Sequence, residues 1–276
     1  MLEKVLLPID FSEPSMRMFE CALDLRELGS KNLILFHAVP KGQNISPENR
    51  RKLDEMEDRL KASGMHVDAI VKAGDPVDLI VAEADMEHVD MIAMASGGKS
   101  RVGVFFVGSV SFGVIKRTCK PILLDKFPVL PEGGRSKECR LGQHLFRNAL
   151  VTIDLPARSQ SVERLFDTLC EKGLANATLL HVIDSSKFSI QDDAHFRGVK
   201  KQLEDIKGRV RGGTCQIKTH VHYGTTAYNI LEAIRETEAS IVVIGTKTGR
   251  TRGLALGTTA EEVVRRSPIP LLVVPC

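Results

Sequence analysis

The sequence predicts an α/β fold that is built twice, each half forming a five-stranded parallel sheet with helices on both faces in a Rossmann-like arrangement. Two observations lead to this fold class. Short runs rich in Val, Ile and Leu alternate with longer amphipathic stretches, as is typical of parallel strands that are buried on both faces and joined by helices. The pattern of the first half also recurs in the second half, in the same order.

The internal repeat rests on matching landmarks. The run VLLPID ends at Asp10 and is matched by LVTID, which ends at Asp154. Asp10 precedes His37 by 27 residues, and Asp154 precedes His181 by the same 27 residues. Because a repeat of this length is a whole structural unit rather than a short motif, it predicts two domains of one fold. The predicted boundaries are residues 1–126 for domain 1, 127–146 for a connector and 147–276 for domain 2.

The length and composition are those of a globular chain. The 276 residues correspond to roughly two domains of about 150 residues each. Hydrophobic residues make up 43% and charged residues 26%, which excludes a disordered or collagen-like chain. The net charge of +3 is too small to favour a nucleic-acid partner, and no apolar run reaches the 18 or so residues of a membrane span. The first ten residues resemble a strand rather than a signal peptide.

The six cysteines are dispersed, without CxxC or zinc-type spacing. This pattern predicts free thiols in a reducing cytoplasm, and therefore a cytoplasmic protein.

The helices are predicted between the apolar runs. Ser46 followed by Pro47 marks a helix start, because serine is a good N-cap and proline suits the first helical position. The predicted helices are Ser15–Leu28, Pro47–Ser63, Val77–Glu87 and Val110–Thr118 in the first half, and Ser161–Lys172, His195–Arg211, Ala227–Thr237 and Thr259–Arg266 in the second.

Candidate ligand-binding residues follow the strands. In doubly wound sheets, ligands bind beyond the carboxyl ends of the strands, where the strand order reverses. Asp10 and Asp154 stand at this point in the two halves, and a carboxylate there can accept hydrogen bonds from ribose hydroxyls or hold a cation over phosphates. The alternative is that each Asp only caps the next helix. His37 and His181 occupy matching positions in the second strand of each half and are interpreted as hydrogen-bonded strand-end residues.

Glycine-rich loops follow the fourth strand of each half. In the first half nine residues separate Gly98 from Gly108, which stands with Ser109 at a helix start. Glycines let backbone N–H groups approach an anion, and a helix N-terminus favours negative charge, so the pattern predicts a phosphate site. The second half has Gly245, Gly249 and Gly257 in a loop of different spacing. The alternative is that these glycines only form tight turns.

A Walker A loop is disfavoured. The run from Ala93 to Ser100 fits a relaxed version of that pattern, but no helix follows it directly and the second half has no GK[ST].

With these motifs, the sequence resembles a tandem universal stress protein. The strand-one Asp, the LFHAV and LLHVI second strands, the glycine loops and the KPILL and IPLLVV fifth strands carry the resemblance. The resemblance implies an adenine nucleotide α-hydrolase-like fold that binds ATP or AMP, with Mg²⁺ as a candidate companion of ATP. It places the nucleotide against Ile9, Asp10, Ala38, Gly98, Gly108, Ser109 and Val110 in the first half, and against Ile153, Asp154, Val182, Gly245, Gly249, Gly257, Thr258 and Thr259 in the second.

The sequence favours a nucleotide-binding regulator of the stress response over an enzyme. No catalytic or metal-ligating set stands out, so any ATP hydrolysis is expected to be weak. A regulator would change a surface for a protein partner that the sequence does not identify. The alternatives are an adenylyl-transferring or slowly ATP-hydrolysing enzyme of the related superfamily, and a nucleotide-free scaffold. The resemblance also implies an intramolecular pseudo-dimer of the two halves through the apolar fifth strands, with a homodimer as a further possibility.

Overall fold

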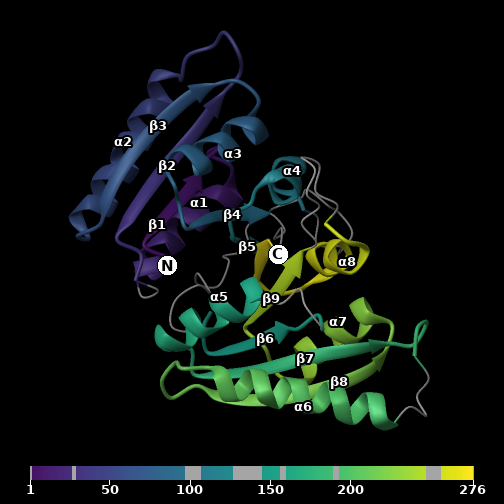
Figure 1. Cartoon of the computed structure of the whole chain (residues 1–276). Helices are drawn as coiled ribbons and strands as arrows, with labels where there is room; N and C mark the ends of the chain where they lie inside the picture. The colour runs from purple at the N-terminus through teal and green to yellow at the C-terminus, as the bar shows by residue number, and fades with distance from the viewer. Residues whose placement is uncertain are drawn as a thin grey trace. The chain divides into compact units, whose positions relative to one another are not determined.

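The structure is a computed structural model that describes residues 2–26, 29–96, 107–126, 145–155, 160–188, 193–246 and 256–275. The chain divides into two compact units, Met1–Gly142 (unit 1) and Gln143–Cys276 (unit 2). Figure 1 shows strands and helices alternating in each unit. Most of the predicted connector lies outside the described residues, so the predicted domain boundaries stay a prediction. The predicted pseudo-dimer of the two halves also stays a prediction.

Unit 1 is a five-stranded parallel sheet in the order β3-β2-β1-β4-β5. Every strand pair is parallel, so each connection must cross over one face and provides a helix. The strands are β1 (Lys4–Pro8), β2 (Asn32–Val39), β3 (His66–Ala73), β4 (Met91–Ser96) and β5 (Ile122–Lys126). The helices are α1 (Glu13–Glu20), continued by the 3₁₀ helix η1 (Cys21–Arg26), α2 (Pro47–Ala62), α3 (Pro76–Met86) and α4 (Ser109–Arg117).

Unit 2 repeats this topology, with the parallel strand order β10-β9-β6-β7-β8. The strands are β6 (Asn148–Thr152), β7 (Asn176–Asp184), β8 (Gln216–Gly224), β9 (Ile241–Thr246) and β10 (Leu271–Pro275). The helices are α5 (Gln160–Glu171), α6 (Asp193–Arg209), α7 (Thr226–Glu236) and α8 (Thr258–Arg266). The predicted fold, a doubly wound sheet built twice, is confirmed.

The strand order fixes the faces on which the helices lie. Right-handed crossovers place the first two helices of a unit on one face of its sheet and the last two on the other. Consistent with this, α3 packs against α4 in unit 1 and α7 packs against α8 in unit 2. Strands β1, β4, β6 and β9 are buried on both faces, which explains their continuous apolar runs.

Local capping explains where three helices of unit 1 begin. The Ser12 and Ser46 hydroxyls accept hydrogen bonds from the first turns of α1 and α2, and the Asp75 carboxylate accepts from two backbone N–H groups of α3. Each of these helices also has proline in its first two positions. The predicted helix Ser15–Leu28 differs, because α1 ends at Glu20 and the chain tightens into η1.

The cysteines differ in part from the sequence-based expectation. Cys119, Cys170 and Cys215 are free thiols, as predicted. Cys21 is disulfide-bonded, so the expectation of free thiols is wrong for this residue. Within the described ranges, no helix combines the length and the apolar character that crossing a membrane requires.

Candidate functional site

The strand order of unit 1 reverses at β1, which pairs with β2 on one side and β4 on the other. Connections from neighbouring strands leave in opposite directions at this point, and folds of this kind bind ligands beyond the carboxyl ends of such strands. Ile9 and Asp10 follow β1 directly, and Ser96 ends β4. The candidate site of unit 1 is therefore at the edge of the sheet that the sequence predicts.

Asp10 is exposed and held by the loop that follows it. Its Oδ1 accepts hydrogen bonds from the backbone N–H of Ser12 at 2.9 Å and from the Ser12 hydroxyl at 2.5 Å. Partial burial tends to raise the pKa of the Asp10 carboxyl, but hydrogen bonds from Ser12 and Ser15 outweigh it, so the pKa is lowered. Asp10 is thus an oriented carboxylate at neutral pH, able to accept from hydroxyl groups or to contact a cation.

A histidine ties the end of β1 to β2. The Nδ1 of His37 donates a hydrogen bond of 2.7 Å to the carbonyl of Ile9, and the imidazole ring lies 4.8 Å from the ring of Phe11. Phe11 itself has a φ of 59°, a left-handed conformation that is uncommon for a bulky residue. The backbone beside Asp10 is thus held in a strained turn, which is frequent at ligand-binding sites.

Unit 2 repeats the histidine contact. The Nδ1 of His181 donates to the carbonyl of Ile153 at 2.8 Å, and burial lowers the pKa of His181. The interpretation of the two histidines as hydrogen-bonded strand-end residues is confirmed. Asp154 follows Ile153 in the same place as Asp10 in unit 1 and is exposed.

Helix α4 begins without the side-chain cap that α1, α2 and α3 have. Gly108 is its N-cap, with φ −58° and ψ 152°, and within the described residues this cap makes no side-chain hydrogen bond. The first intrahelical bond runs from the Phe112 N–H to the Gly108 carbonyl at 2.9 Å, so the N–H groups of residues 109–111 precede it. The Ser111 hydroxyl donates to the Ala95 carbonyl at 3.1 Å, which fixes this turn to the end of β4.

Helix α8 of unit 2 also begins at a glycine without a side-chain cap. Gly257 has a φ of 78°, in the left-handed region that favours glycine. Leu256, which precedes it, is buried and anchors the chain, as Val107 does before Gly108. The first intrahelical bond runs from the Glu261 N–H to the Gly257 carbonyl, so the N–H groups of Thr258 and Thr259 precede it.

The other predicted site residues lie on four elements. Ala38 lies in β2, one residue before the strand ends at Val39, and Val182 lies in β7, two residues before the strand ends at Asp184. Gly245 is within β9, in register with Val274, rather than in the loop that follows. Ser109 and Val110 are the first residues of α4. Gly98 and Gly249 lie outside the described residues, as do most of both glycine loops.

Sequence reasoning missed two features of the site. The first is the left-handed turn at Phe11, for which no sequence signal exists because glycine or asparagine is the usual occupant. The second is the Asp10–Ser12 contact, in which an Asp side chain accepts from the backbone two residues further on. The Asp-x-Ser pattern is a known signal for such a turn and could have revealed it.

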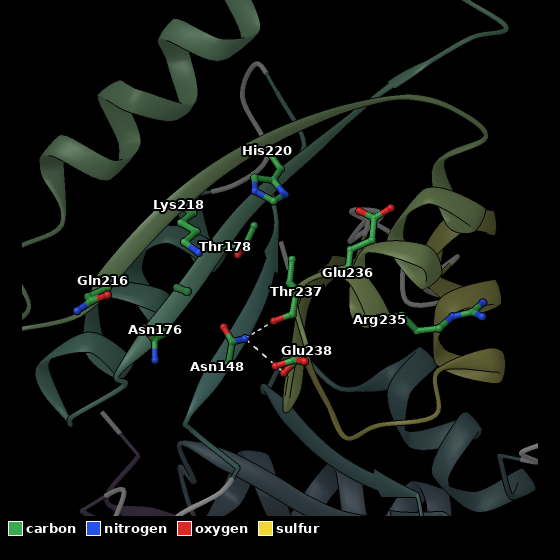
Figure 2. Close-up of a pocket in the computed structure, with 11 residues that line it drawn as sticks. Asn148, Asn176, Thr178, Gln216, Lys218, His220, Arg235, Glu236, Thr237 and Glu238 are labelled. Atoms are coloured by element: carbon green, nitrogen blue, oxygen red, sulfur yellow. Dashed lines mark hydrogen bonds between the residues drawn. The ribbon is translucent and has the colours of Figure 1, made fainter.

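A cavity of about 390 Å³ lies at the opposite edge of the unit 2 sheet. Figure 2 shows its polar lining, drawn from the amino ends of β6, β7 and β8 and the end of α7. None of the predicted nucleotide-binding residues lines this cavity, which combines Lys218 and Arg235 with Glu236 and Glu238. Its charges are mixed, so it does not favour an anionic ligand, and the candidate site remains at the carboxyl edge.

Two histidines of β8 lie on one face of the strand beside this cavity. The rings of His220 and His222 are stacked with centroids 6.1 Å apart, and His222 Nε2 is 3.5 Å from a Glu236 carboxylate oxygen. Burial, followed by the proximity of His222, lowers the pKa of His220. In the parts of the chain that the structure describes, no three His, Cys, Asp or Glu residues are grouped closely enough to hold a metal ion.

The fold and the site define a protein of two doubly wound α/β units, each with a carboxylate and an uncapped helix start at its carboxyl edge. The universal stress protein family model matches residues 1–126 and 145–275. The chain therefore belongs to the universal stress protein family, with two copies of the family's domain.

Curated relatives match single halves of the chain. It is 26% identical over 155 residues to universal stress protein MJ0577 of Methanocaldococcus jannaschii, an alignment that covers 46% of this chain and 96% of the relative. It is 28% identical over 135 residues to the universal stress protein in the QAH/OAS sulfhydrylase 3' region of Thermus aquaticus, covering 45% of this chain and 98% of that protein.

Among solved structures, a universal stress protein from Archaeoglobus fulgidus matches the whole chain. The TM-score is 0.76 at 23% identity, with 100% of this chain and 99% of that chain covered. At this identity the likeness supports the fold and does not extend to a ligand.

Proposed function

We propose that this protein binds an adenine nucleotide, ATP or AMP, at the carboxyl edge of each sheet and acts as a regulator of the stress response. One observation carries the proposal. In unit 1 the helices α1, α2 and α3 are capped by a serine or aspartate side chain, whereas α4 begins at Gly108 with no side-chain cap. The open helix start is on the same sheet edge as the oriented Asp10 carboxylate.

The residues at this edge fit the parts of a nucleotide. The uncapped N–H groups at the starts of α4 and α8, with the partial positive charge of a helix N-terminus, suit phosphates. A Cβ at Gly108 would meet no atom of the described residues within 4 Å, so these residues leave the space beside this N-cap open. The ionised Asp10 suits ribose hydroxyls or an Mg²⁺ ion beside the phosphates.

Unit 2 supports a separate site. It has the equivalent Asp154 and an uncapped α8, but the backbone at Gly257 differs from that at Gly108, with φ 78° against −58°. The two helix starts therefore present their N–H groups differently. We propose that the two units bind nucleotide independently and with different affinities.

The binding proposal is tested by titrating the purified full chain with ATP and with AMP, with and without Mg²⁺, by calorimetry and thermal shift. We expect saturable heat with one or two sites per chain. Ligand at 100 times Kd stabilises the folded protein by about 2.7 kcal/mol, which is easily measured. Absence of both heat and thermal shift at millimolar ATP and AMP would contradict the proposal.

The same samples separate a regulator from an enzyme. For a regulator, bound ATP is recovered intact from the protein by denaturation and mass spectrometry after hours of incubation. Formation of more ADP or AMP than there is protein, which requires multiple turnovers, would favour the alternative of an ATP-hydrolysing enzyme. A chain that binds neither nucleotide would favour the scaffold.

A further inference from the structure

Two free thiols meet in unit 2. Cys170 is in the last turn of α5, and Cys215 directly precedes β8, 45 residues further along the chain. The segment that carries Cys215 packs against the end of α5, and the two thiols are close enough for each to shift the pKa of the other. Neither forms a disulfide, and Cys119 is the other free thiol in the described part of the chain. The contact between residues so distant in sequence is a product of the fold.

Tight backbone packing holds the two cysteines together. Gly212 is buried against the end of α5, where a Cβ would lie 2.4 Å from Cys170 Cβ and 2.6 Å from the backbone nitrogen of Glu171. No side chain fits in this space without displacing the backbone. Glycine at this position therefore lets the segment that carries Cys215 pass directly over Cys170.

The segment is also anchored on both sides of Cys215. Before it, the Arg211 N–H donates to the Asp167 carboxylate at 2.7 Å. After it, the Gln216 N–H donates to the Ala175 carbonyl at 2.9 Å. The two thiols are thus held at one place by the backbone, and no large movement is needed to bring them into contact.

The two thiols differ in chemical character. Cys215 is partly exposed, and the neighbouring Cys170 thiol lowers its pKa, which favours the nucleophilic thiolate. Cys170 is 2% exposed, and the neighbouring Cys215, with burial as a second cause, raises its pKa. The accessible thiol is therefore the one that reacts first, and the buried thiol is its neighbour.

We propose that Cys170 and Cys215 form a redox-active dithiol that a hydroperoxide oxidises to a disulfide. The Cys215 thiolate attacks a peroxide oxygen, so that an S–O bond forms, the O–O bond breaks and the leaving oxygen takes up a proton as water or alcohol. Cys170 then attacks the sulfenic sulfur, so that the S–S bond forms and the S–O bond breaks. The hydroxide leaves as water with the Cys170 proton. The two sulfurs lose two electrons in total, and the peroxide gains them.

This site is independent of the proposed nucleotide site. The end of α5 and the start of β8 lie at the amino edge of the sheet, whereas Asp154 and Gly257 follow the carboxyl ends of β6 and β9. The oxidised chain is therefore expected to bind nucleotide with the same affinity as the reduced chain. A failure of the nucleotide proposal would not affect the thiol chemistry.

The test starts from the full chain, reduced and freed of reductant, and treated with one to two equivalents of hydrogen peroxide. Free thiols are then alkylated, and the protein is digested with trypsin. We expect a disulfide-linked pair of the peptides 165–172 and 212–218 as the main product. The link closes a long loop, so it should raise the Tm by about 5 to 15 °C.

Three variants complete the test. In Cys170→Ser the sulfenic acid of Cys215 should accumulate and be trapped by a cyclic 1,3-dione, and in Cys215→Ser the Cys170 thiol should stay reduced. Cys119→Ser, which changes an exposed single thiol, should give the same linked peptides as the parent chain. Cross-linking should be about tenfold faster than oxidation of Cys119.

Two outcomes would overturn the proposal. One is that the peptides 165–172 and 212–218 remain alkylated after peroxide treatment that oxidises Cys119. The other is that the link forms no faster in the native chain than in urea, because the fold would then contribute nothing to the pairing.

Discussion

Gly108→Val is expected to weaken nucleotide binding by unit 1 by about tenfold to a thousandfold. The branched side chain fills the open space beside the start of α4, where a phosphate would approach the uncapped N–H groups of residues 109–111. Loss of two or three hydrogen bonds, each worth about 0.5 to 1.5 kcal/mol and more when the acceptor is charged, accounts for this range. Calorimetric titration with ATP and AMP measures the change in affinity.

The backbone at Gly108 makes this variant a clear test. Its φ of −58° is open to any residue, and an added Cβ has no neighbour within 4 Å among the described residues, so unit 1 should fold as before. Gly257→Val is a less direct test of unit 2, because a φ of 78° strains a branched residue by about 1 to 3 kcal/mol. A loss of binding there would combine steric exclusion with a distorted helix start.

Thr225→Val is a matched control, since it also places valine at the N-cap of a helix, α7, whose cap makes no side-chain hydrogen bond. It should bind nucleotide like the parent chain. Gly108→Ala, with one methyl group in the open space, should have an intermediate effect. If Gly108→Val folds and binds with unchanged affinity and stoichiometry, the start of α4 is not the phosphate site.

Most of the fold could be predicted because the same pattern of apolar runs and helices occurs in both halves of the sequence. The predicted helix Pro47–Ser63 and the observed α2, Pro47–Ala62, differ by one residue, since a serine N-cap and a proline mark the start. The predicted Ser15–Leu28 was less accurate, because the tightening of the chain into η1 after Glu20 has no comparable signal. The strands could be located from continuous apolar runs, because a strand that is buried on both faces is apolar along its whole length.

The candidate site was less predictable than the fold. The sequence places Asp10 and Gly108 at a common edge, because the carboxyl ends of parallel strands must meet there. It does not distinguish Gly108 from Gly257, whose φ angles differ in sign although their neighbours are alike. The contact between Cys170 and Cys215 was also invisible, because it depends on how closely Gly212 approaches α5 and not on any local pattern.

Lys126 should make the stability of the protein depend on pH. This lysine ends β5, in register with Ser96, and is 5% exposed. Burial lowers its pKa to about 7, whereas a lysine in an unfolded chain has a pKa of about 10.4. Between these values the unfolded state binds more protons than the folded state, so the free energy of unfolding rises with pH, by at most about 1.4 kcal/mol per pH unit. The cost of burying the charge is fully present below pH 7 and fades toward pH 10.

Lys126→Met removes the ionisable group and keeps an apolar chain of similar length. It should raise the free energy of unfolding by about 2 to 4 kcal/mol at pH 7 and by progressively less toward pH 10. Denaturant unfolding at pH 7, 8 and 9 measures the difference, and Lys41→Met, at an exposed position of unit 1, is the control for losing one surface charge. A difference between Lys126→Met and the parent chain that does not change with pH would mean that Lys126 keeps an ordinary pKa in the folded protein.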